Sequence, residues 1–320
     1  AWLANALPAE WRTTNATTED SSVEIRRAWD KLLFAAGYAG LSWPSEYGGR
    51  EAGPIAETIF FEELARAHAP EGLGRIGRVM AGPLIIAHGT DAQRRRFLPC
   101  ILDGSEIWCL GYSEPHAGSD LAAVSTRAMR EGGCYRIRGR KIWTSHAHHA
   151  DRCVLLARTS PDGPRYQNLS ILLLDMKQPG VVVTPVITAA GDHHFNEVVF
   201  DDAVADTEDR LGPENEGWRI FRSSLVFERG GAVALNHYLE MRHQCDTLAD
   251  CCAAHSALPG ALERSRSLAD QVELVRWHVM RMNEMEANGI YPQSVQIVMK
   301  LFFSELWQQL TEFGASMMCD

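Results

Sequence analysis

The sequence places one carboxylate, that of Glu228, on the core-facing side of a predicted helix. From Trp218 to Leu239, apolar side chains recur in alternating steps of three and four residues, which predicts one long helix, and Glu228 lies on its apolar stripe. Burial of an unpaired carboxylate is costly, so this group should be ion-paired, hydrated or protonated. The residue is either half of a salt bridge with a nearby arginine or a general base whose pKa is raised in an apolar cleft. Gly230 and Gly231 follow closely, and because two glycines inside a helix cost about 2 kcal/mol relative to alanine, we expect something large to pack there.

Two short segments carry hydroxyl groups beside small or aromatic residues. Residues 112–120 read Tyr-Ser-Glu-Pro-His-Ala-Gly-Ser-Asp, and Ser113 and Ser119 could donate hydrogen bonds to a ligand. Residues 141–145 read Lys-Ile-Trp-Thr-Ser, and Trp143 beside two hydroxyls in a strand could form the floor of an aromatic cofactor site. Each segment also has a plainer interpretation, an ordinary Pro/Gly loop and a strand with a packed tryptophan, which is favoured when the segment is taken alone.

The histidines and cysteines do not have the spacing of a metal site. His146, His148 and His149 lie close together in the chain, and His193 and His194 form a second pair. We expect exposed loop histidines and no metal. The eight cysteines contain no C-x-x-C pair and are too few for a disulfide scaffold, which predicts reduced, mostly buried, cytosolic thiols.

Composition and charge limit the class of protein. The chain has 320 residues, about two domains' worth, and 46% of them are hydrophobic, which is typical of a globular protein. With 31 basic and 41 acidic residues the net charge is −10, and no block of Lys or Arg suggests a nucleic-acid or anionic-membrane binder. The absence of 18 consecutive apolar residues predicts no transmembrane segment. No signal peptide is visible at Ala1 and no Met begins the chain, so we expect missing first residues and a cytoplasmic location.

The predicted elements fall into three parts. We place a helical domain at residues 1–107, a β domain at 108–211 and a second helical domain at 212–320. In the first part, Ser21 or Ser22 is expected to cap a helix that ends at Gly37, and Thr90 or Asp91 to cap a later one.

The middle part changes to a period of two residues. The Gly132-Gly133 pair before an alternating segment predicts a hairpin. Runs rich in branched side chains follow at Cys153–Ala157, Leu169–Leu174, Val181–Val183 and Val198–Phe200. This pattern predicts a small antiparallel β domain inserted between helical ones. The last part has three amphipathic helices, an incomplete bundle that a fourth helix would bury better, and we expect residues beyond Asp320.

Motifs in a fixed order resemble those of the acyl-CoA dehydrogenase family. They read Trp-Pro-x-Glu-Tyr-Gly-Gly from Trp43, Ser-Glu-Pro-x-Ala-Gly-Ser-Asp from Ser113, Gly-x-Lys-x-Trp from Gly139, Phe-Asn-Glu-Val-x-Phe-Asp-Asp from Phe195 and Gly-x-Glu-Asn-x-Gly-Trp from Gly212. The likeness runs from Gly37 to Leu301. It implies an α+β fold with an N-terminal helical domain, a middle antiparallel β domain and a C-terminal helical bundle.

The resemblance also implies that FAD lies between the β domain and the C-terminal helices. The implied cofactor-binding residues are Leu110, Tyr112, Ser113, Gly118, Ser119, Trp143, Thr144 and Ser145. Trp143 would cover one face of the flavin, and Ser119 would also lie by the substrate's pantetheine. Family members place the base either late in the chain or on the first C-terminal helix. The pair Glu228-Arg229 matches the second arrangement, with Arg229 binding substrate, and the apolar stripe singles out the same glutamate.

The implied reaction is the α,β-dehydrogenation of an acyl thioester. Glu228 would take the α-proton while a β-hydride passes to FAD, so that acyl-CoA becomes trans-2-enoyl-CoA. The implied partners are acyl-CoA or a related acyl thioester, electron-transfer flavoprotein or another electron acceptor, and further subunits in a homo- or hetero-oligomer, dimer or tetramer. The segments Gly-x-Lys-x-Trp-Thr-Ser and Phe-Asn-Glu-Val look most like actinobacterial-type members that act on bulky or steroid side-chain thioesters.

Three other functions are compatible with the same scaffold. A flavin oxidase would be reoxidised rapidly by oxygen, and an N-hydroxylase or carrier-protein enzyme would reject CoA thioesters. The third is a non-catalytic subunit of a heteromer. Glu228 argues against this last function, whereas the lack of the family's Arg-x-x-Phe-Gly motif between His237 and Met282 argues for it.

Overall fold

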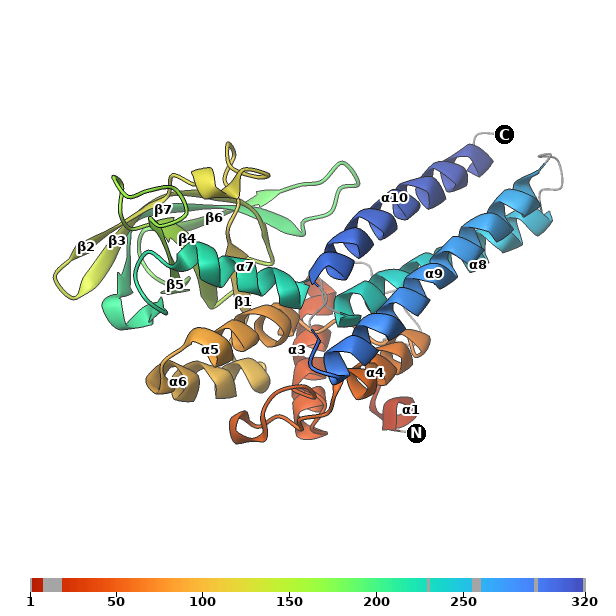
Figure 1. Ribbon diagram of the computed structural model, residues 1–320, viewed down its shortest axis with the longest axis horizontal. Coiled ribbons are helices and arrows are strands. Elements are labelled where there is room, and N and C mark those ends of the chain that lie inside the picture. Colours follow the sequence, from red (N-terminus) through yellow and green to blue (C-terminus); the bar gives the residue numbers. More distant parts are fainter. Residues whose placement is uncertain (1, 8–18, 229–230, 255–259, 291–292, 319–320) are drawn as a thin grey trace. The chain divides into compact units, whose positions relative to one another are not determined.

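The computed structural model describes residues 2–7, 19–228, 231–254, 260–290 and 293–318 (Figure 1). Its helices are α1 (Trp2–Ala6), α3 (Glu19–Ala35), α4 (Pro54–Arg66), α5 (Gly82–His88), α6 (Asp91–Leu102), α7 (Gly217–Glu228), α8 (Gly231–Ala254), α9 (Ala261–Ala287) and α10 (Gln293–Met318), with short turns η1 (Ser45–Tyr47), η2 (Gly77–Ala81), η3 (Leu121–Ala123) and η4 (Thr207–Asp209). Its strands are β1 (Trp108–Gly111), β2 (Arg127–Glu131), β3 (Cys134–Ser145), β4 (Arg152–Arg158), β5 (Leu169–Asp175), β6 (Val181–Val186), β7 (Phe195–Asp206) and β8 (Arg210–Leu211). Helices, then strands, then helices follow along the chain, which confirms the predicted fold class.

The chain divides into two compact units, each made of separate segments. The first, which we call the sheet unit, contains Ala6–Arg50 and Pro70–Phe227. The second, the bundle unit, contains Ala1–Asn5, Glu51–Ala69 and Glu228–Asp320. The three-domain boundaries after residues 107 and 211 remain a prediction from the sequence.

Two helices of the sheet unit test the predicted caps. Helix α3 already includes Ser21 and Ser22, so the prediction that either caps it is wrong. Gly37 adopts φ +73° just after the helix, a left-handed conformation that glycine adopts without steric cost. Thr90 caps α6 as predicted: its side chain accepts a hydrogen bond from the backbone N–H of Gln93, whose own side chain accepts one from the N–H of Thr90.

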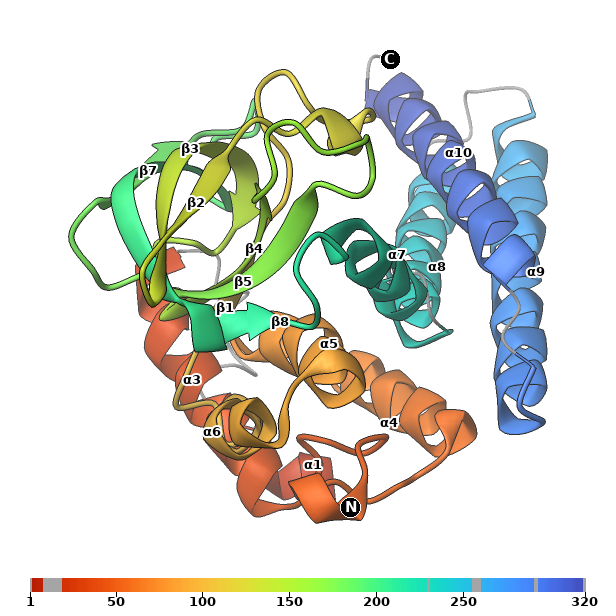
Figure 2. The ribbon, with the colours of Figure 1, turned by 60° about the vertical axis from the view of Figure 1, so that its left-hand side comes forward.

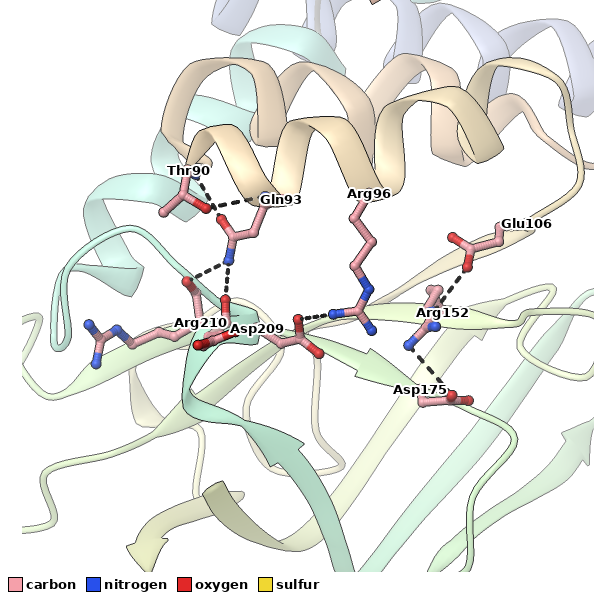
Figure 3. Close-up of polar contacts among 9 residues, drawn as sticks. Thr90, Gln93, Arg96, Glu106, Arg152, Asp175, Asp209 and Arg210 are labelled. Atoms are coloured by element: carbon pink, nitrogen blue, oxygen red, sulfur yellow. Dashed lines mark hydrogen bonds and ion pairs between the residues drawn. The ribbon is translucent and has the colours of Figure 1, made fainter. Parts of the chain in front are cut away.

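The same glutamine fastens α6 to the end of the β domain (Figure 3). Its Nε2 donates to the backbone oxygens of Glu208 at 2.7 Å and Arg210 at 2.9 Å. One turn further along, Arg96 pairs with Asp209, with 2.7 Å between Nη1 and Oδ1. These contacts hold the residues just before α7 against a helix of the N-terminal part.

The eight-stranded sheet has the order β6-β7-β3-β2-β4-β5-β8, with β1 beside β4. The hairpin predicted at Gly132-Gly133 joins β2 to β3. Most strand pairs are antiparallel, as predicted, but β1 and β2 each pair with β4 in parallel. A parallel pair needs a long connection, and residues 112–151 supply it between β1 and β4. Figure 2 shows how strongly the sheet curves.

The bundle unit gathers helices that are far apart in the sequence. Helices α8, α9 and α10 pack on one another as predicted, and α4 packs on α8 and α9. The hydrophobic core of α8, α9 and α10 includes Met241, Val275 and Leu306, and Phe61 of α4 packs against it. In addition, Asn283 of α9 donates a buried hydrogen bond to Thr58 of α4. Helix α4, from the N-terminal part of the chain, therefore packs with the three predicted C-terminal helices.

The single long helix predicted through Glu228 covers the residues of two helices in the structure, α7 and α8. Helix α7 ends at Glu228 and α8 begins at Gly231, while Arg229 and Gly230 lie outside the described residues.

The sheet unit contains two thiols that match the predicted state. Cys109 and Cys153 are free, buried and opposite each other on β1 and β4. A hydrogen bond with Cys153, together with burial, raises the pKa of the Cys109 thiol well above its usual value.

Within the described ranges, the helices are too short or too polar to cross a membrane.

Candidate active site

Strand β3 of the sheet unit has an unusual backbone conformation at Trp143. Between Lys141 and Thr144 the register of β3 against β7 shifts, so that β3 has one residue more than its partner strand. Trp143 adopts φ +61°, a left-handed conformation that is costly for a bulky residue and that a β-bulge can impose. The bulge turns the indole outward, 56% exposed, with its ring edge-on to Phe195 at 5.7 Å. Trp143 is therefore presented to solvent, and the interpretation as a packed core tryptophan is wrong.

The two residues after Trp143 provide hydroxyl groups. Thr144 is 1% exposed, and its Oγ1 has no hydrogen-bond partner among the described residues. Buried hydroxyls normally have a partner, so this one is suited to an atom of a bound molecule. Ser145 is half-buried beside it. An exposed indole next to an unsatisfied hydroxyl fits a planar ring system with a polar edge, as the flavin of FAD is.

The loop after β1 runs alongside this bulge. The backbone oxygen of Ser113 accepts a hydrogen bond from the N–H of Ile142 at 3.0 Å, so Ser113 lies directly beside the bulge. The Tyr112 ring meets Phe221 of α7 edge-on at 5.1 Å. Of the other predicted cofactor residues, Leu110 is half-buried on β1, whereas Gly118 and Ser119 are exposed further along the loop. The structure thus brings Ser113 and residues 143–145 together.

A buried ion pair holds this loop against β3. Lys141 is fully buried, and its Nζ lies 2.9 Å from Oε1 of Glu114 and 2.9 Å from the backbone oxygen of Tyr112. Glu114 also accepts hydrogen bonds from the backbone N–H groups of Ser125 and Thr126, at 2.7 and 2.9 Å. Burial alone would raise the pKa of Glu114, but the ammonium group and these hydrogen bonds outweigh it and lower the pKa to about 2. Burial lowers the pKa of Lys141 to about 8.

The pKa of Glu114 predicts an acid dependence of stability. The folded value of about 2 lies below the ordinary 4.5, so Glu114 stabilises the fold fully above about pH 4.5 and loses this effect as the pH falls toward 2. A shift of this size corresponds to roughly 3 kcal/mol. We expect the free energy of unfolding of wild type to fall across this window more steeply than that of Glu114→Gln, measured by urea titration at each pH. Asp202→Asn, which removes an exposed partner of Arg138, is the control. Equal slopes for wild type and Glu114→Gln would contradict the prediction.

Sequence reasoning did not identify Glu114 and Lys141 as site residues, although both lie inside the motifs. A signal was available: Tyr135, Ile137 and Lys141 share the inward face of β3 by the two-residue period. A lysine on a core-facing position requires a buried anion, which points to a carboxylate nearby.

Five histidines gather beside the bulge. Ring centroids lie 4.4 Å apart for His146 and His194, 3.8 Å for His148 and His149, and 4.1 Å for His148 and His193. They are buried or half-buried, so the prediction of exposed loop histidines is wrong. Burial is the main cause that lowers the pKa of His146 to about 3 and that of His148 to about 4, so both are neutral near pH 7. Within the described part of the chain, no three potential ligands are arranged to hold a metal ion.

The predicted base, Glu228, lies at the end of a range of described residues. Glu228 is the last residue of α7, and its side chain lies outside the described residues, as does all of Arg229. Before it, α7 buries Ile220, Phe221 and Ser224 in the sheet unit.

Comparison with known proteins gives family matches over residues 4–203 and a relative that covers 98% of the chain. Residues 4–105 match the family description "Acyl-CoA dehydrogenase, N-terminal domain" and residues 109–203 match "Acyl-CoA dehydrogenase, middle domain". The chain is 38% identical over 317 residues to "Acyl-CoA dehydrogenase IpdE1" of Mycobacterium tuberculosis, covering 98% of this chain and 82% of that protein.

Two solved structures share the fold. One is described as "Tcur3481-Tcur3483 steroid ACAD", with TM-score 0.83, 25% identity and coverage of 97% of this chain and 82% of that one. The other is the ChsE4-ChsE5 complex from Mycobacterium tuberculosis, with TM-score 0.79, 28% identity and coverage of 98% and 82%. The matches to both domain descriptions and the 38% identity to a relative over 98% of the chain show that it belongs to the acyl-CoA dehydrogenase family of FAD-dependent oxidoreductases.

Proposed function

We propose that this chain dehydrogenates the α,β bond of a bulky acyl-CoA, with its flavin seated at the Trp143 bulge. The observation that carries the proposal is the outward-turned Trp143 beside the buried, unpartnered hydroxyl of Thr144. Strained backbone of this kind persists where function requires it. The family membership supplies the reaction, the oxidation of acyl-CoA to trans-2-enoyl-CoA.

The residues around the bulge would bind and orient the cofactor. The Trp143 indole stacks on one flavin face, and the hydroxyls of Ser113, Thr144 and Ser145 hydrogen-bond along its polar edge. Gly118 and Ser119, exposed on the loop after β1, would contact the cofactor, and Ser119 would also lie by the substrate's pantetheine. FAD held by these residues would supply the acceptor for the hydride that leaves the β-carbon.

Glu228 is proposed as the base that takes the α-proton. Its support is the apolar stripe that reaches it along α7 and the following Arg229-Gly230-Gly231, in which the glycines allow close approach of a large ligand. A carboxylate desolvated on such a stripe is a stronger base than one in water. Arg229 is proposed to contact the substrate.

Anaerobic flavin bleaching tests the substrate class. The neighbour described as a steroid ACAD supports a bulky acyl group. We expect a steroid side-chain CoA thioester to bleach the flavin at least about tenfold faster than butyryl-CoA, because a pocket shaped for a large apolar group loses binding energy with a small one. The matched control is the same steroid acid without CoA, which should not bleach. Butyryl-CoA bleaching at an equal rate would contradict the bulky substrate, and rapid reoxidation in air with peroxide release would favour the oxidase.

We further propose that the active form is a dimer or tetramer, containing a second gene product. Two structural neighbours carry two protein names each, Tcur3481-Tcur3483 and ChsE4-ChsE5. In the bundle unit, Ile297, Val298 and Leu301 of α10 are each more than half exposed, which is typical of an unsatisfied interface. Sedimentation velocity of the flavin-loaded protein should therefore show an oligomer when it is co-expressed with its partner. A stable flavin-loaded monomer that turns over substrate would contradict this assembly.

A further inference from the structure

We infer that Asn196 of β7 is a positioning residue that holds the Trp143 bulge in the shape the flavin requires. The inference rests on the flavin site proposed above. Asn196 is fully buried and lies opposite Thr144 in the β3–β7 register, at the first pair after the shift. Its side chain therefore meets β3 directly after the extra residue that turns Trp143 outward.

The hydrogen bonds of Asn196 determine the orientation of its amide group. Nδ2 lies 3.1 Å from the backbone oxygen of Thr144, and a carbonyl oxygen can only accept. The NH₂ group must therefore face Thr144. It also lies 3.0 Å from Nδ1 of His148, so that nitrogen accepts, and Oδ1 lies 2.9 Å from Nε2 of His193, so that nitrogen donates. Both ends of the amide are held, and it cannot rotate without losing bonds.

The bulge needs such a restraint. A bulge interrupts the ladder of backbone hydrogen bonds, and a tryptophan at φ +61° stays there only where its surroundings enforce it. The Thr144 carbonyl that Asn196 binds belongs to the residue that follows Trp143. Holding it fixes the peptide plane between Thr144 and Ser145, and with it the backbone that follows the turn at the indole.

The restraint is specific to an amide side chain. Aspartate has nearly the same volume but offers only acceptors, so it would repel the Thr144 oxygen. Serine is too short to bridge the carbonyl to the two imidazoles. We therefore expect both substitutions to loosen the bulge while the core packing around position 196 changes little for aspartate.

The experiment compares the FAD complexes of wild type, Asn196→Asp and Asn196→Ser. The measurements are the dissociation constant of FAD from the apoprotein, by flavin fluorescence, and the visible absorption spectrum of the bound flavin. We expect FAD to bind at least about tenfold more weakly to both variants, with altered fine structure in the absorption bands, because the ring contacts shift. Asn168→Asp is the matched control: Asn168 is also buried in the β domain and donates to a backbone oxygen, that of Gly163, before β5. Asn168→Asp should leave the dissociation constant of FAD within twofold of wild type and the absorption spectrum of the bound flavin unchanged.

The outcomes separate this inference from the site on which it rests. Trp143→Ala that leaves both the FAD affinity and the flavin spectrum unchanged would reject the proposed flavin site. Trp143→Ala that changes them while both Asn196 variants behave as wild type would reject the positioning role alone. An effect of Asn168→Asp as large as that of Asn196→Asp would also overturn it, because any buried asparagine would then do the same. If neither Asn196 variant folds, the residue is a folding determinant and the inference is rejected.

Discussion

Glu228→Gln is expected to slow flavin reduction by substrate at least about a hundredfold, the lower end for loss of a general base. Glutamine keeps nearly the volume of glutamate but cannot take a proton, so folding, FAD binding and ligand binding should survive. Stopped-flow bleaching under saturating acyl-CoA measures the reduction step directly.

If Glu228 is instead half of a buried ion pair, the same substitution should change stability rather than the rate of flavin reduction. Breaking such a pair would lower stability by about 3 kcal/mol or more and leave the bleaching rate nearly intact. A thermal melt of the same variant therefore separates the two roles. Glu305→Gln, a glutamate exposed on α10, is the matched control and should change neither quantity. A folded Glu228→Gln protein that bleaches at the wild-type rate would move the base to another residue.

Lys141→Met is expected to destabilise the sheet unit by about 3–5 kcal/mol, because it leaves the Glu114 carboxylate buried without its cation. The Lys141 ammonium is fully buried and bonds both the carboxylate and the Tyr112 oxygen, so no solvent can replace it. Urea titration followed by circular dichroism measures the change. Because the loop that carries Ser113 is held by this pair, flavin affinity should fall as well.

An exposed ion pair between β3 and β7 provides the control. Arg138 binds Asp202 with 2.7 Å between Nε and Oδ1, but both side chains are well exposed, so Arg138→Met should cost less than about 1 kcal/mol. The double variant Lys141→Met with Glu114→Gln should recover part of the loss, since it removes the stranded charge. A Lys141→Met effect no larger than that of Arg138→Met would show that the pair contributes little.

Much of the fold could be predicted because it depends on local patterns. Gly37 follows the end of α3, Thr90 caps α6, and the Gly132-Gly133 pair joins β2 to β3, each through the backbone preferences of a few neighbouring residues. Of the predicted cofactor residues, Ser113 lies beside the Trp143 bulge, because its backbone oxygen accepts a hydrogen bond from the N–H of Ile142.

The features that could not be predicted depend on contacts between distant segments. The outward turn of Trp143 results from a mismatch in residue number between β3 and β7, and a single strand's sequence does not report the register of its partner. The amide of Asn196 is oriented by Thr144 and His148, about fifty positions earlier in the chain. Likewise, α4 joins the bundle unit through long-range packing that helical periodicity does not encode.

The position of α4 has a consequence for how the chain folds during synthesis. Thr58 is bonded to Asn283, 225 positions later, so the apolar face of α4 leaves the ribosome long before its partners exist. At elongation rates of about 5–20 residues per second that delay is roughly 11 to 45 seconds. Through this interval Phe61 does not yet have the native core of α8, α9 and α10 to pack against, so we expect this apolar face to bind chaperones on the nascent chain. Closing so long a loop also makes completion of the bundle one of the slow steps of folding.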